Sequence, residues 1–281
     1  MSLSVFISVD MEGIAGITTL RQTMRATDDY PWAREIMTEE ANAAIAGAFD
    51  ASARKVVVSD SHGDMGNLLP HKLDQRADLV QGSPKVPYSM MTGIDENFAC
   101  AAFIGYHAGA GTPDAILAHT YAGFITDLRV NGDPWNETHL NAALAGTFGV
   151  PVAFVAGDRA CCDQAKERLP WVKTVAVKEG LGDRVGRSQS PTKARAAIRG
   201  LIRDAVKNAE RLEAWTPKGP YTLELDLIDT AVADLCTLCP GTERSGPRTV
   251  AFETDDFRVL YRCMLTLMHL GRSAAPSSKV D

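Results

Sequence analysis

Short apolar segments that end in polar residues recur along the first half of the chain and constrain its fold more than any other feature. Their length and their β-branched or aromatic residues favour buried strands. Between them, residues 33–53 and 137–148 have apolar side chains at helical spacing. Alternating strands and helices predict an α/β fold, with a mostly parallel sheet flanked by helices. The expected strands are Val5–Val9, Lys55–Asp60, Cys100–Tyr106 and Pro151–Ala156.

A second, smaller unit is expected after this sheet. The composition becomes polar near Ser188–Pro191, and a long amphipathic helix follows. Two strand patterns and a last helix come after the prolines at positions 217 and 220. Earlier in the chain, Asn131-Gly132 predicts a tight turn between strands. We therefore expect an α/β domain over residues 1–190, a smaller α+β domain over 191–272, and a disordered tail over 273–281.

Composition argues against several classes of function. The net charge is −6 and no basic stripe stands out, which disfavours nucleic acid as a partner. No apolar run approaches the roughly 18 residues of a membrane span, and no export signal is recognised. We expect a cytoplasmic protein without a membrane partner. The six cysteines stand in apolar contexts and are expected to be buried free thiols, and the Cys236–Cys239 spacing alone does not indicate a functional site.

Two acidic residues follow the first predicted strand. Asp10 and Glu12 are two positions apart, so both side chains face the same way if the extended backbone continues. Carboxylates placed side by side repel each other. They are tolerated if a cation lies between them, if one is protonated, or if both face water. An isolated pair leaves all three explanations open.

Histidines follow two other predicted strands. His62 comes after the strand that ends at Asp60, and His107 directly follows Tyr106. One histidine in such a place is more often structural or solvated than a ligand. In open α/β sheets, however, the carboxyl ends of the strands meet where ligands bind. Together with Asp10 and Glu12, these imidazoles indicate a catalytic metal centre that suits zinc, with manganese or cobalt as alternatives.

Six short motifs, in this order, resemble peptidase family M55, the D-aminopeptidases of the dipeptide-operon type. They are S-V-D-M-E-G, V-S-D-S-H-G, I-G-Y-H-A, L-A-H-T, N-E-T-H-L-N-A and P-G-T-E. Each motif is weak alone, and their specificity comes from their combination over nearly the whole chain. The resemblance implies a self-compartmentalising zinc aminopeptidase. It further implies a homodecamer of stacked rings that releases N-terminal D-amino acids from short peptides such as D-alanyl dipeptides.

Carried onto this chain, the resemblance implies a set of metal ligands and one catalytic residue, His119. A glutamate in the first turn of a helix, as at Glu137, is otherwise typical of a solvated surface. Five ligands exceed the usual three for one catalytic zinc, so two Zn²⁺ ions per subunit are expected, with Asp10 as the bridge. His119 would act as a nucleophile or as a general acid or base. The implied ligands are Asp10, Glu12, His62, His107 and Glu137.

Other parts of the sequence match the family pattern less well. The loop over residues 108–118 is one residue longer than in the best-known member, which allows a different substrate preference. Lys178 and Arg184 lie in a loosely matching segment and are expected to be surface charges, and Glu40 is expected to be solvated. Two alternative functions are a metal-dependent phosphoesterase and a non-catalytic peptide-binding protein. The first lacks an arginine pair beside the ligands, and the second lacks an export signal.

Overall fold

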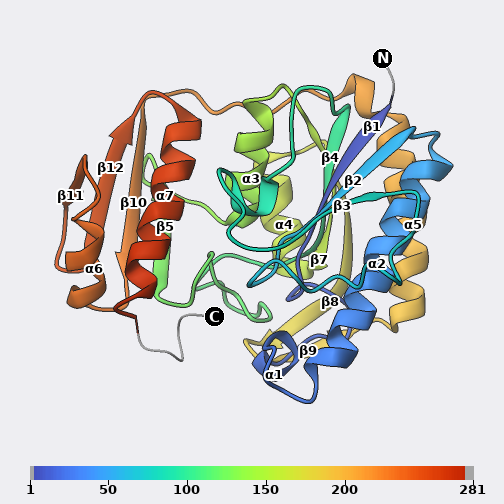
Figure 1. Cartoon of the computed structure of the whole chain (residues 1–281), viewed down its shortest axis with the longest axis horizontal. Helices are drawn as coiled ribbons and strands as arrows, with labels where there is room; N and C mark the ends of the chain where they lie inside the picture. The colour runs from blue at the N-terminus through green and yellow to red at the C-terminus, as the bar shows by residue number, and fades with distance from the viewer. Residues whose placement is uncertain (1–2, 276–281) are drawn as a thin grey trace.

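The computed structural model describes residues 3–275 and contains two β-sheets (Figure 1). The larger sheet has seven strands in the order β3-β2-β1-β4-β7-β8-β9. All neighbouring strands are parallel except β8 and β9, which form a hairpin. The predicted mostly parallel α/β sheet is therefore confirmed. Its strands are β1 (Ser4–Val9), β2 (Lys55–Asp60), β3 (Asp78–Val80), β4 (Cys100–Tyr106), β7 (Val152–Asp158), β8 (Lys173–Gly182) and β9 (Val185–Ser188).

Side chains of the central strands alternate between two apolar cores. On β1, Val5, Ile7 and Val9 face one core, whereas Phe6 faces the other. Helices α2 (Tyr30–Asp50) and α5 (Pro191–Lys207) cover the first face, and α3 (Glu137–Gly146) and α4 (Arg159–Arg168) cover the second. Figure 1 shows α3 and α4 between the two sheets. With both faces buried, the strands have the continuous apolar sequence that parallel sheets require.

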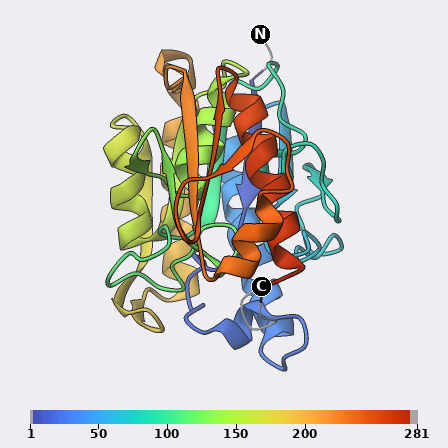
Figure 2. The same ribbon diagram turned by 90° about the vertical axis from the view of Figure 1, so that its left-hand side faces the viewer.

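The smaller sheet is antiparallel, with strand order β11-β12-β10-β5-β6 (Figure 2). β5 and β6 are joined by Asn131-Gly132, where φ is +55° and +81°, so the predicted tight turn is confirmed. The elements of this part are β5 (Ile125–Val130), β6 (Asp133–Pro134), β10 (Tyr221–Leu227), α6 (Thr230–Cys236), β11 (Thr242–Arg244), β12 (Thr249–Thr254) and α7 (Phe257–Arg272). A short helix α1 (Leu20–Thr23) and the 3-10 turns η1 (Ser89–Met91) and η2 (Ala209–Arg211) complete the described chain.

The two sheets share one apolar core. Helix α7 contributes Leu260 and Met264 to the same cluster as Leu140 and Leu144 of α3. The chain also crosses between the sheets, because β5 and β6 join the smaller sheet while α5 packs against α2 of the larger part. The domain boundary expected near residue 190 stays a prediction. So does the expected disordered tail, which from residue 276 onward lies outside the described residues.

A close backbone approach fixes the loop that follows β1. The Gly13 N–H donates to the Gly105 carbonyl at 2.7 Å. A Cβ atom on Gly13 would lie only 1.9 Å from the Tyr106 carbonyl oxygen, so no larger residue fits without moving the backbone. The chain after β1 is thereby pressed against the end of β4, where the predicted ligands begin.

Two further expectations concern the cysteines and the membrane. All six cysteines are free, and five are buried, Cys239 being partly exposed. The expectation of free thiols is thus confirmed. Among the helices of residues 3–275, none has the length and apolar content needed to cross a membrane.

Candidate metal centre

Neighbouring strands of the larger sheet carry the acidic and imidazole side chains predicted for a metal site. β1 lies between β2 and β4. Asp10 follows β1, His62 follows β2 and His107 follows β4. Backbone pairing continues past the strand ends, since the Asp10 N–H donates to the Ile104 carbonyl at 2.8 Å. The three strand ends are therefore held side by side at the edge where α/β sheets bind ligands.

Asp10, Glu12 and His62 form one compact group. Nδ1 of His62 lies 3.0 Å from Oε2 of Glu12 and 3.4 Å from Oδ1 of Asp10. On the far side of the ring, the Nε2–H donates to the Thr23 carbonyl at 2.9 Å. That hydrogen bond selects the tautomer in which Nδ1 presents its lone pair to the two carboxylates.

His107 and Glu137 face Asp10 from the other side. Nε2 of His107 lies 3.5 Å from Oδ2 of Asp10 and 3.5 Å from Oε1 of Glu137. Its Nδ1–H donates to the Ala108 carbonyl at 3.0 Å, so Nε2 has the lone pair. Among the described residues, this buried nitrogen has no hydrogen-bond partner. A lone pair that faces two carboxylates and accepts no hydrogen bond fits a cation between the three groups.

The spacings of these atoms suit tetrahedral zinc. Two ligand atoms about 2.1 Å from one ion, at a tetrahedral angle, lie about 3.4 Å apart. The separations of Asp10 from His62 and His107 are 3.4 Å and 3.5 Å, and His107 and Glu137 are 3.5 Å apart. Asp10 directs one oxygen toward each histidine and so borders both groups.

Burial and charge act against each other at this site. With no ion among the groups, burial lowers the pKa of His107, but Glu137 and Asp10 outweigh burial and raise that pKa well above its usual value. The same opposition, with Glu12 as the main partner, raises the pKa of His62. Burial, together with Glu12, raises the pKa of Asp10. Three buried carboxylates therefore draw positive charge to the site, which either protons or metal ions can supply.

His119 stands at the border between this cluster and the solvent. Its ring stacks on that of His107 with the centroids 4.1 Å apart. Its Nδ1–H donates to the Leu117 carbonyl at 2.9 Å, and its Nε2 lies 3.9 Å from Oε1 of Glu137. The His119 side chain is 25% exposed, against at most 10% for the five predicted ligands. It is thus the imidazole that a bound molecule meets first, although it is also near enough to His107 and Glu137 to share an ion with them.

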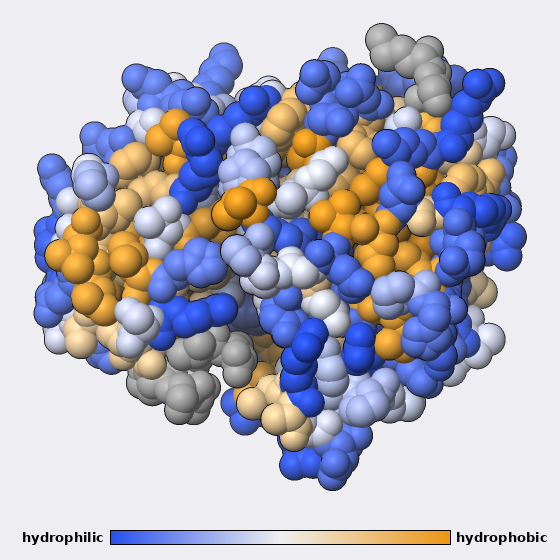
Figure 3. Space-filling model, viewed as in Figure 1, coloured by the Kyte–Doolittle hydropathy of each residue, from blue (hydrophilic) through white to orange (hydrophobic). Residues whose placement is uncertain are grey.

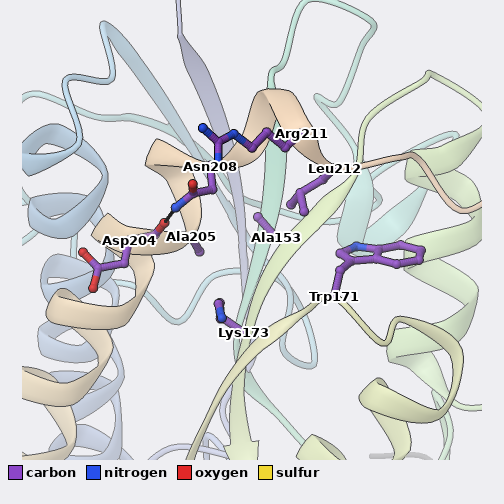
Figure 4. A pocket seen from close by; sticks show the side chains of 8 residues that line it. All are labelled: Ala153, Trp171, Lys173, Asp204, Ala205, Asn208, Arg211 and Leu212. Carbon is purple, nitrogen blue, oxygen red and sulfur yellow. Dashed lines mark hydrogen bonds between the residues drawn. The ribbon is translucent and has the colours of Figure 1, made fainter.

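A cavity of about 930 Å³ opens over this edge of the sheet. Its walls include α1, the loop over residues 83–87, the loop that carries His119, and one side of α7. Figure 3 shows the surface hollowed at the lower edge between the two parts of the molecule. A smaller hollow of about 370 Å³ lies where β7 and β8 begin, beside Ala153 and Lys173 (Figure 4). It is at the opposite edge of the sheet and contains none of the predicted site residues.

Two of the expected surface charges are in fact buried. Lys178 is 2% exposed, and its Nζ donates to the carbonyls of Glu12, Ile14 and Ile17. Glu40 is 1% exposed and accepts a hydrogen bond from the Ala15 N–H at 2.9 Å. Both predictions were wrong because local sequence does not show that the loop after β1 turns its backbone polar groups inward, where charged side chains satisfy them. Arg184 is exposed, as expected, and lines the cavity.

An α/β sheet with buried imidazoles and carboxylates at its carboxyl edge, under a large cavity, is the arrangement of a metal-dependent enzyme. The family model for peptidase M55, described as D-aminopeptidase, matches residues 3–266. The chain therefore belongs to this family, and the family prediction made from the six motifs is confirmed.

Similarity in sequence and in structure to the D-aminopeptidase of B. subtilis supports this assignment. The D-aminopeptidase of Bacillus subtilis (strain 168) is 37% identical over 269 residues, which cover 95% of this chain and 97% of the relative. A solved structure described as the Zn-dependent D-aminopeptidase DppA from B. subtilis, a self-compartmentalizing protease, superposes with a TM-score of 0.93 at 36% identity. That match covers 98% of this chain and 99% of the relative. Family membership favours a peptidase over the phosphoesterase and the peptide-binding protein.

Zinc should stabilise the wild-type protein, and His107→Ala should remove most of that effect. A ligand at 100 times its Kd contributes about 2.7 kcal/mol to stability. Thermal unfolding with and without zinc after chelation measures the gain, and His71→Ala, at an exposed histidine, is the control. Equal zinc stabilisation of His107→Ala and wild type would exclude His107 as a ligand.

Zinc affinity should also fall as the pH falls, because protons compete for nitrogens whose pKa is raised.

Proposed function

We propose that this protein is a zinc aminopeptidase that releases N-terminal D-amino acids from short peptides, D-alanyl dipeptides among them. The proposal is supported by membership of a D-aminopeptidase family and by the zinc dependence stated for the solved relative. The observation that carries it is the position of Asp10, at ligand spacing from both His62 and His107. This cluster lies at the inner end of a cavity large enough for a peptide.

The proposed centre holds two zinc ions in each subunit. Asp10, Glu12 and His62 would bind one ion, and Asp10, His107 and Glu137 the other. Bound ions of this kind polarise a carbonyl group and lower the pKa of a coordinated water. The imidazole and carboxylate donors also accept manganese or cobalt, which elemental analysis of the purified protein distinguishes from zinc.

His119 is proposed as the residue that acts directly on the peptide. Its Nδ1–H is held by the Leu117 carbonyl, so Nε2 has the free lone pair and faces the cavity side of Glu137. A nucleophile or a general base uses this lone pair, and a general acid uses the same nitrogen in its protonated form. The exposure of the ring allows contact with a substrate, whereas the proposed ligands are more deeply buried.

His119→Ala should keep its zinc and lose turnover by at least about 10²-fold, the lower end for a positioned acid or base. Zinc content by elemental analysis and hydrolysis of D-alanyl and L-alanyl dipeptides are measured on the same preparations. His71→Ala should match the wild type in both. An active His119→Ala protein would remove the catalytic assignment, and an inactive protein without zinc would make His119 a ligand instead. A protein that cleaves a chromogenic phosphate ester but no peptide would overturn the proposed function.

The charges of the cavity suit a peptide with both termini free. The carboxylate cluster lies at one end, where a peptide amine would be held. Two arginines of α7, Arg262 and Arg272, also line the cavity, and within residues 3–275 neither is part of an ion pair. Other cavity cations are already engaged, such as Arg25 with Asp64 at 2.6 Å. We infer that the α7 arginines receive the C-terminal carboxylate of a short substrate.

Amidation of a D-alanyl dipeptide should therefore raise KM about tenfold, which corresponds to about 1.4 kcal/mol. The double variant Arg262→Gln/Arg272→Gln should lose this preference for the free acid. Without the two arginines, the carboxylate has no cation to pair with, so the acid and the amide should have the same KM. Steady-state kinetics on the acid and the amide provide the test, and Arg211→Gln, at the opposite edge of the sheet, is the control. Equal KM values for acid and amide with the wild-type protein would contradict the orientation.

The chain is also proposed to assemble into a closed homodecamer in the cytoplasm. The solved relative is described as self-compartmentalizing, which requires an enclosed assembly. Large apolar side chains are exposed on the single chain, with Val86 at 75%, Leu238 at 69% and Leu181 at 62%. Closed symmetry is the usual arrangement of homo-oligomers. Light scattering should give ten subunit masses, and a monomer at micromolar concentration would exclude the assembly without affecting the proposed chemistry.

A further inference from the structure

The residues on both sides of His119 have backbone conformations that are costly for large side chains. Leu117 has φ +55° and Tyr121 has φ +61°, both in the left-handed region that favours glycine. Such conformations persist only where surrounding contacts impose them, and they concentrate at functional sites. The contacts that hold this turn therefore show what determines the position of His119.

On the Leu117 side, the turn is held by backbone contacts. The Leu117 N–H donates to the Asp183 carbonyl at 2.8 Å, in the turn between β8 and β9. The Leu117 carbonyl in turn accepts the Nδ1–H of His119. Leu117 is thus anchored to a neighbouring hairpin and orients the imidazole directly.

On the Tyr121 side, the contacts reach the metal centre and the smaller sheet. The Tyr121 N–H donates to Oε1 of Glu137 at 2.7 Å. Its hydroxyl donates to the phenolic oxygen of Tyr261 in α7 at 2.6 Å, and its oxygen lies 3.1 Å from Oδ1 of Asn141. Tyr121 therefore joins the His119 turn, a predicted ligand and the last helix of the described chain.

The partners of Tyr121 are themselves firmly held. Tyr261 and Asn141 are fully buried, and the Tyr261 hydroxyl donates to Oδ1 of Asn141 at 2.6 Å. Asn141 donates from Nδ2 to the Tyr106 hydroxyl at 2.8 Å, and Tyr106 is 2.7 Å from Oγ of Ser8 in β1. A satisfied buried network of this kind is rigid, because each member fixes the next. The position of Tyr121 is therefore determined by the interior of both sheets.

We propose that Tyr121 and Tyr261 are positioning residues for the reaction. Their hydroxyl contact holds the left-handed turn at Tyr121, and through it sets His119 against Glu137 and the bound ions. Neither phenol needs to touch the substrate, since both act through the backbone of the turn. This role rests on the proposed function, in which His119 acts on the peptide, and it makes α7 part of the catalytic apparatus as well as of the cavity wall.

Tyr121→Phe and Tyr261→Phe test this role, because each removes one hydroxyl and keeps the aromatic ring. Each variant should lower kcat by about 10- to 100-fold, since a displacement of about 1 Å at a reacting group can cost about 10²-fold. KM for a D-alanyl dipeptide should stay within about twofold, and zinc content should equal that of the wild type. The two hydroxyls form one contact, so the kcat of the double variant should be no lower than that of the less active single variant.

Tyr221→Phe is the matched control. The Tyr221 hydroxyl donates to the Pro217 carbonyl, in the smaller part of the molecule. This variant makes the same chemical change and should keep the wild-type kcat. Thermal unfolding of all variants separates stability from turnover. A lower unfolding temperature with unchanged kcat per bound zinc would assign the tyrosines a purely structural role and overturn the proposal.

Other outcomes also decide the question. Losses of kcat that multiply in the double variant would show that the hydroxyls act independently, against the proposal. Loss of zinc in parallel with activity would mean that Tyr121 supports Glu137 as a ligand and does not position His119. If His119→Ala is inactive while both phenylalanine variants keep the wild-type kcat, only the positioning role fails. If His119→Ala is fully active, the proposed function fails instead.

Discussion

The structure depends on a concentration of buried negative charge that the fold itself does not neutralise. Asp10, Glu12 and Glu137 are each at most 5% exposed. Each has an oxygen within 3.5 Å of a nitrogen of His62 or His107. Isolated carboxylates are too costly to bury, so cations or protons must accompany them. The backbone around the cluster is arranged to keep those charges together when repulsion would separate them. Metal binding at the proposed centre would therefore be coupled to folding.

Two residues counter this repulsion by fixing the backbone of the loop after β1. Gly13 allows the loop after β1 to approach the end of β4 more closely than any side chain permits. Lys178 is an internal cation whose three N–H groups bind carbonyls of that same loop, including the Glu12 carbonyl. Burial lowers the pKa of Lys178 to about 8, and the nearby carboxylates of Asp158, Glu40 and Glu12 act against this shift. The positions of the proposed ligands thus depend on residues that are not themselves proposed ligands.

The sequence predicted those parts of the molecule whose signals are local. The mostly parallel sheet follows from apolar runs, and Asp10, Glu12, His62 and His107 were identifiable because each lies within three residues of the end of such a run. Glu137 and His119 were not, because the first turn of a helix and a glycine-containing loop give no sign of what they face. They came only from the family resemblance. The contact of Tyr121 with Tyr261 spans 140 positions, and the pairing of β5 with β10 likewise depends on the tertiary fold, which no local pattern records.

The place of α7 also has a consequence for the order in which the protein becomes active. Synthesis proceeds from the amino terminus, and every predicted ligand has been made by the time residue 137 is added. Such a nascent chain still lacks β10, β12 and α7, and with them part of the shared core, one wall of the cavity and the Tyr261 hydroxyl. A peptidase built this way acquires its ligands early but its working site late.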